Sequence, residues 1–165
     1  MRGTLFAPLL LGALAAPALA QDSQLGIGDA VPAINIEHFF QGDAVAAFDR
    51  QKTYVLEFWA TWCEPCHKEI SELKEVLAEF KNSDIKLILI NLKEDQTKVE
   101  LFMKQRNYPG LILLDKFGVV ASNYGVTSLP RLFVIGKDGK LVWQTNGYQR
   151  DLKEKMRTVL KKLLL

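Results

Sequence analysis

Residues 54–66, YVLEFWATWCEPC, join a strongly apolar run to a pair of cysteines and decide the fold. The first six residues are rich in β-branched and aromatic side chains, a composition typical of a strand buried on both faces of a sheet. Pro65 fits the first turn of a helix, where its missing N–H removes no hydrogen bond. The stretch therefore predicts a buried strand, a short loop and a helix that begins near Pro65.

After Pro65, segments in which apolar residues recur every three to four positions alternate with continuous apolar runs. The first helix is expected to reach about Phe80, with Glu and Lys on its outer face. Further strands are predicted at 85–92, 111–114, 131–135 and 141–143, and further helices at 99–106 and from about 151. We therefore predict an α/β domain in which a βαβ half and a ββα half form a central mixed sheet flanked by helices.

Residues 1–20 have the composition of a secretory signal peptide. Arg2 is their only charge, an apolar stretch runs from Leu5 to Leu14, and small residues precede a polar segment that begins at Gln21. The apolar stretch is shorter than the roughly 20 residues that span a membrane. We expect a cleaved signal and a periplasmic protein, with an uncleaved N-terminal tether as the alternative.

The remaining chain divides into an N-terminal extension, residues 21–50, and a main domain, residues 51–165. The segments Val31–Ile36 and Ala44–Ala46 surround Gly42-Asp43 and predict a β-hairpin within the extension. The chain carries 21 basic and 19 acidic residues with no basic cluster, which argues against a nucleic-acid partner. We expect a monomer.

Cys63 and Cys66 are the only cysteines, three positions apart. A disulfide that closes so small a loop constrains the unfolded chain little, so the pair indicates redox chemistry. A helix N-terminus favours a thiolate, because its unpaired N–H groups and macrodipole attract negative charge. Cys63 is expected to be the exposed attacking thiol, and Cys66 the thiol that resolves the mixed disulfide. This chemistry needs no metal and no cofactor.

The motif and its surroundings resemble thioredoxins, and in particular the exported TlpA/ResA-like thiol-disulfide oxidoreductases. The resemblance extends from Gly28–Pro32 through Tyr124–Val126 to Pro130 and Gly147. It implies a thioredoxin fold and a protein-disulfide reductase. It also implies exported cysteine-containing proteins as clients, apocytochrome c among them, and a membrane thiol carrier as the electron donor.

The same resemblance assigns residues around the dithiol. Pro130 matches a cis proline that lies beside the cysteines in that family, and the residue before it offers its backbone to an extended client segment. That residue is Leu129 here, where thioredoxins usually have threonine or a similar residue. Trp62 is expected to shape the docking surface, whereas Trp59 is expected to pack in the core.

Glu57 interrupts the apolar strand, and burial there raises the pKa of a carboxyl group. Thioredoxins have an aspartate at the matching position, and the resemblance implies that Glu57 takes the proton of Cys66. The lysine that neighbours this acid in many thioredoxins is replaced by Leu89. The alternative is a glutamate at the strand end that reaches solvent.

Glu64, Pro65 and His67 are the residues expected to tune the Cys63 thiolate. The charge of Glu64 opposes the thiolate, which raises the pKa of Cys63 and makes the dithiol more reducing. Glu64 could instead only stabilise the helix as an acid in its first turn. His67 either lies in solvent or lends positive charge to the thiolate.

Other interpretations of the motif remain open. Cys63 to His67 also fit C-x-x-C-H, the attachment pattern of c-type haem, although the strand–helix context is that of a redox dithiol. A peroxiredoxin-like thiol peroxidase is a second alternative, but Ala60 occupies the position of its expected threonine. The third is an assembly factor that holds client proteins without redox chemistry.

Overall fold

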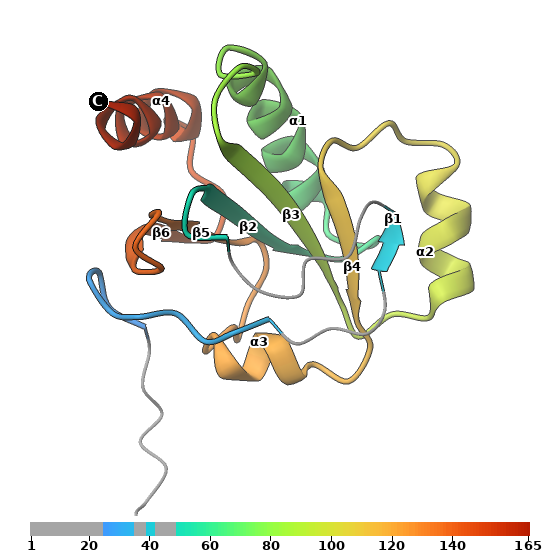
Figure 1. Cartoon of the computed structure of the whole chain (residues 1–165). Helices are drawn as coiled ribbons and strands as arrows, with labels where there is room; N and C mark the ends of the chain where they lie inside the picture. Colours follow the sequence, from blue (N-terminus) through green and yellow to red (C-terminus); the bar gives the residue numbers. More distant parts are fainter. Residues whose placement is uncertain (1–24, 35–38, 42–48) are drawn as a thin grey trace, which may run out of the picture.

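The computed structural model describes residues 25–34, 39–41 and 49–165, so the predicted signal peptide lies outside the described residues. The described strands form one mixed sheet in the order β1-β4-β3-β2-β5-β6 (Figure 1). These strands are β1 (Phe39–Gln41), β2 (Thr53–Trp59), β3 (Ile85–Leu92), β4 (Leu111–Asp115), β5 (Arg131–Ile135) and β6 (Leu141–Asn146). The pairs β2–β3 and β3–β4 are parallel, and the others are antiparallel. This is the predicted thioredoxin-type arrangement.

The described helices divide between the two faces of this sheet. They are α1 (Glu64–Ala78), α2 (Gln96–Met103), α3 (Val119–Asn123) and α4 (Leu152–Leu164). Apolar residues of α1, α2 and α4 share one core cluster with one face of the sheet, whereas α3 contributes to the cluster on the other face (Figure 1). The result is a three-layer α/β domain.

β2 lies between β3 and β5, and all seven of its residues are buried. Side chains alternate along a strand, so Val55, Glu57 and Trp59 point toward α1, α2 and α4. Tyr54, Leu56 and Phe58 point toward α3. The register of this strand therefore places Glu57 beneath the helix that carries the two cysteines.

Most of the predicted elements are confirmed, and β3 and β5 have the predicted bounds. α2 begins at Gln96 instead of Val99, because the carboxylate of Asp95 caps it by accepting from the N–H of Thr97. α3 was not predicted, since five residues are too few for a helical period to stand out. No described helix has the length and apolar character needed to cross a membrane.

The N-terminal extension differs from the predicted hairpin. Val31 to Ile34 form no strand, and Pro32, which lacks an N–H, accepts a hydrogen bond from the hydroxyl of Tyr124 at 2.7 Å. The strand that does form here, β1, pairs with β4 at the edge of the sheet. The expected partner segment, Ala44–Ala46, lies outside the described residues.

Candidate active site

The two cysteines lie where β2 ends and α1 begins, and they form a disulfide with a Cα–Cα distance of 5.3 Å. Cys63 is the N-cap of α1, and its Sγ accepts a hydrogen bond from the backbone N–H of Cys66 at 3.3 Å. The predicted position of the dithiol at a helix N-terminus is therefore confirmed.

The prediction that Cys63 is exposed is wrong for this disulfide form. Only 3% of Cys63 is accessible to solvent, and Cys66 is fully buried. Cys63 belongs to the core cluster that contains Trp59 and Ile70, and its sulfur is bonded to a sulfur inside that core. Cys63 is still the more accessible of the two thiols.

Glu94, at the end of β3, holds the loop before the cysteines. Its carboxylate accepts hydrogen bonds from the N–H and the hydroxyl of Thr61, both at 2.6 Å, and from the side-chain amide of Asn91 at 2.8 Å. Lys98 forms an ion pair with the same carboxylate at 2.6 Å. Burial raises the pKa of Glu94, but these bonds outweigh it, so the pKa lies below that of an ordinary glutamate. Glu94 therefore stays ionised and fixes Thr61.

His67 holds the same loop from the other side. Its Nε2 donates to the carbonyl oxygen of Thr61 at 3.0 Å, and its Nδ1 lies 2.5 Å from the hydroxyl of Tyr108. A carbonyl can only accept, so a neutral imidazole with its hydrogen on Nε2 accepts the Tyr108 hydroxyl at Nδ1. Burial raises the pKa of Tyr108 to about 12, which keeps this donor protonated.

This geometry corrects one interpretation of His67. The side chain is buried, so it does not lie in solvent. Both ring nitrogens are engaged, and its ring stacks on Phe102 at a centroid distance of 5.0 Å. His67 therefore positions the loop that precedes Cys63, and its effect on the Cys63 thiolate stays a prediction.

Glu57 is fully buried, so the alternative of a solvent-reaching strand end is excluded. Leu89 of β3 is the residue that pairs with Glu57 in the sheet, so no lysine stands at that position. Its nearest ionisable neighbour is Glu69, which lies one turn after Cys66 on the buried face of α1. No donor from the rest of the described chain reaches the oxygens of either carboxyl group.

Two ionised carboxylates offer only acceptors, so Glu57 and Glu69 can share a hydrogen bond only when one of them is protonated. Burial raises the pKa of Glu57 well above its ordinary value, and the charge of Glu69 and the bond to it raise that pKa further. Burial also raises the pKa of Glu69, to about 7, although the bond from Glu57 opposes this. Above about pH 7 the pair therefore holds one proton, on Glu57, and Glu69 takes up a second proton as the pH falls through about 7.

The remaining predicted residues surround the disulfide. The Leu129–Pro130 peptide bond is cis, as expected from the match to Pro130. Leu129 is half-buried, whereas 67% of Trp62 is exposed to solvent. Glu64 is exposed as the first residue of α1, and Pro65 follows it in the first turn. Trp59 is fully buried, so its predicted packing role is confirmed.

Sequence reasoning missed Glu69, Glu94 and Tyr108. Glu69 looked like part of the polar face of a helix, although its spacing of three from Cys66 and four from Leu73 placed it on the buried face. Glu94 and Tyr108 act across 33 and 41 residues of sequence, and no local pattern encodes such contacts.

Comparison with known proteins places the chain among redox proteins. A model of the Redoxin family matches residues 27–160. Thiol-disulfide oxidoreductase ResA of Bacillus thuringiensis subsp. konkukian (strain 97-27) is 36% identical over 112 residues, which cover 68% of this chain and 64% of that protein. The alignment thus spans slightly less than two thirds of ResA. Sporulation thiol-disulfide oxidoreductase A of Bacillus subtilis (strain 168) is 27% identical over 139 residues, 81% of this chain and 82% of that protein.

Solved structures share the fold. The crystal structure of StoA from Bacillus subtilis superimposes with a TM-score of 0.67 and 24% identity, and covers 80% of this chain and 99% of that one. A thiol:disulfide interchange protein of the thioredoxin family from Chlorobium tepidum TLS has a TM-score of 0.69 and 21% identity, over 85% of this chain and 99% of the other. These likenesses confirm the predicted thioredoxin fold.

Proposed function

The chain belongs to the redoxin family, and we propose that it is a thiol-disulfide oxidoreductase that reduces disulfides of other proteins through Cys63 and Cys66. One observation carries the proposal. The two cysteines form a disulfide at a helix N-terminus, and two fully buried carboxyl groups accompany them, Glu57 on the preceding strand and Glu69 on the same helix. A structural disulfide has no need of such a pair, whereas a thiol that must lose a proton inside the core does.

The proposed reaction has two steps. The Cys63 thiolate attacks a client disulfide, one client sulfur leaves as a thiolate, and a mixed disulfide forms. Cys66 then loses its proton to the Glu57–Glu69 pair and attacks the sulfur of Cys63. The Cys63–Cys66 bond forms, the second client sulfur leaves, and the client has gained the two electrons that the dithiol has lost.

Cys66 needs help to ionise because it is fully buried, and burial disfavours a thiolate. Cys66 and Glu69 are three residues apart on one helix face, a rise of about 4.5 Å. The carboxyl pair is the base that this geometry offers. This extends the role first expected of Glu57 alone.

The position of Glu64 supports a reducing dithiol. Glu64 is the first residue of α1 and directly follows Cys63, the residue that must carry negative charge. A nearby negative charge disfavours the thiolate and so stabilises the disulfide, which makes the dithiol the better electron donor.

We further propose that the protein acts in the periplasm, where it has been exported by a cleaved signal peptide. Its clients there are exported cysteine-containing proteins such as apocytochrome c. A membrane thiol carrier supplies the electrons that reduce the Cys63–Cys66 disulfide again. Residues 1–20 support the location, and the resemblance to ResA supports the client class.

Trapping of mixed disulfides tests the proposed function. Cys66→Ala in the full chain should accumulate client proteins bound to Cys63, because the resolving thiol is missing. Cys63→Ala is the matched control and should trap none. Equal trapping by both variants, or none by either, would show that Cys63 does not attack client disulfides.

A further inference from the structure

Carboxylates wind along α1 from the core to the surface. After Cys66, glutamates follow at steps of three, three, three and four residues, at positions 69, 72, 75 and 79. A step of three residues falls about 60° short of a full turn, so each side chain is rotated relative to the previous one. Glu69 is fully buried, Glu72 is half-buried, and 63% of the Glu75 side chain is exposed.

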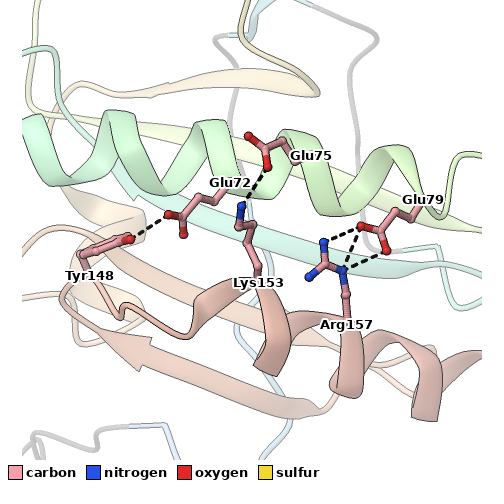
Figure 2. Close-up of polar contacts among 6 residues, drawn as sticks. All are labelled: Glu72, Glu75, Glu79, Tyr148, Lys153 and Arg157. Carbon is pink, nitrogen blue, oxygen red and sulfur yellow. Dashed lines mark hydrogen bonds and ion pairs between the residues drawn. The ribbon is translucent and has the colours of Figure 1, made fainter.

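The first two members of this row, Glu69 and Glu72, lead from the buried base toward solvent. Glu69 contacts Glu57 on one side, and the charge of Glu72 acts on it from the other. Glu72 Oε1 accepts a hydrogen bond from the hydroxyl of Tyr148, in the segment before α4, at 2.7 Å (Figure 2). Glu72 Oε2 is buried and has no partner among the described residues.

The last two members differ, because cations of α4 neutralise them. Glu75 pairs with Lys153 at 3.0 Å, and Glu79 pairs with Arg157 at 2.7 Å (Figure 2). The nearby Lys68 lies over the ring of Tyr148 at 4.6 Å. None of the ion pairs in the described part of the chain includes Glu57, Glu69 or Glu72.

We propose that Glu57, Glu69 and Glu72 form a proton path, and that Glu72 is its exit to solvent beside Tyr148. The proposal rests on the proposed function, in which Cys66 gives its proton to the buried pair. Cys66 gives a proton to the Glu57–Glu69 pair. Glu69 then passes a proton to Glu72, and Glu72 releases it to water. The path therefore restores the pair to its singly protonated state after each turnover, and it runs in reverse when the disulfide is reduced again.

The test is a single turnover of the reduced full chain with a peptide disulfide, quenched with acid and alkylating agent to follow the mixed disulfide. Glu72→Gln should slow its resolution about tenfold and shift the pH profile of that step. Glu75→Gln is the matched control, one step further along the same row. Added acetate should restore part of the rate of the Glu72→Gln variant, since a small acid can exchange protons where the carboxylate was lost.

The variants separate the two proposals. If Glu72→Gln resolves the mixed disulfide as fast as Glu75→Gln, with the same pH profile and no effect of acetate, the exit is not Glu72. If Glu69→Gln also leaves resolution unchanged while Cys66→Ala still traps clients, the buried pair is not the base and the path fails with it. The path predicts that Glu69→Gln and Glu72→Gln combined are no slower than Glu69→Gln alone.

Discussion

At the scale of single residues, the buried carboxyl groups near the dithiol lower the stability of the folded protein. Glu57 and Glu69 are fully buried and unpaired with any cation, so ionisation of the second group destabilises the folded state. A neutral amide of the same shape would avoid this cost. Such a placement is typical of functional sites rather than of structural cores.

Glu69→Gln should therefore stabilise the protein, and more so as the pH rises. The folded-state pKa of Glu69 lies above its unfolded value, so the folded protein binds the extra proton between about pH 4.5 and 7 and loses stability through that window. The shift to about 7 corresponds to about 3 kcal/mol. Urea unfolding of the oxidised variant and of the wild type at pH 5, 6.5 and 8 measures this.

The free-energy difference between variant and wild type should grow with pH by a few kcal/mol. Glu75→Gln, at an exposed site, should show no such growth. A difference for Glu69→Gln that is constant from pH 5 to 8 would mean that Glu69 ionises normally.

Glu94→Gln should loosen the loop before Cys63. The side-chain amide of Gln would present N–H groups to Thr61, which itself presents two donors, and the ion pair with Lys98 would be lost. We therefore expect the free energy of unfolding to fall by about 1–2 kcal/mol at neutral pH, and Cys63 to react more slowly. The pKa of Glu94 in the folded protein lies below its ordinary value. Its contribution to stability is therefore fully present above the ordinary pKa and is lost as the pH falls through the folded-state pKa. Urea unfolding at pH 7 and pH 3 tests both statements.

The control for this loop variant is Glu100→Gln on α2, whose carboxylate bonds only the nearby Gln96. It should change neither stability nor rate appreciably. If both variants lose the same stability and rate, the loss comes from the removal of a negative charge and not from the contacts of Glu94 with the loop.

How far the sequence predicts these residues depends on the reach of their contacts. The roles of Cys63, Cys66 and Pro65 follow from their order along the chain, and the burial of Glu57 follows from the apolar strand around it. Glu69 is different, because the same helical period allows a glutamate to face solvent or core, and only the packing of α1 on β2 decides. His67 likewise depended on Tyr108, which the chain brings in from a separate segment.

At the scale of elements, α4 is attached to α1 by two kinds of contact. Leu152, Met156 and Leu160 are buried in the core cluster shared with α1. Beside them, ion pairs cross between the helices at Glu75 and Glu79 (Figure 2). Leu164, the last residue of α4, is 37% exposed.

The apolar contacts should dominate the attachment of α4. Leu160→Ala leaves a cavity in a fully buried site and should cost about 2–4 kcal/mol of unfolding free energy. Arg157→Ala removes an exposed ion pair and should cost much less, with a difference that shrinks as salt is added. Urea unfolding at low and high salt compares the two, and a larger loss for Arg157→Ala would reverse this order.

Element prediction succeeded where a run was long or strongly apolar, as for β2, β3 and α1. It failed for α3, which is too short to show a period, and in the N-terminal extension, where Pro32 blocks strand pairing. The pairing of β1 with the edge strand β4 could not be predicted either, because a three-residue strand carries no local signal of its partner.

At the scale of the whole molecule, the fold brings the segments around the dithiol to one end of the sheet. Cys63 follows β2, Glu94 follows β3, and the cis Leu129–Pro130 bond precedes β5, the other neighbour of β2. The alternation of β2 then puts Glu57 in the layer below α1. A central strand flanked in this way allows residues from separate segments to converge on one dithiol.

The equilibrium reduction potential of the full chain, measured against glutathione and dithiothreitol series, tests the central claim most directly. A dithiol that Glu64 makes reducing should titrate near or below thioredoxin's roughly −270 mV, and Glu64→Gln should raise the potential. A potential near roughly −120 mV, the value of a strong oxidant, would contradict the account and assign the protein to disulfide formation instead.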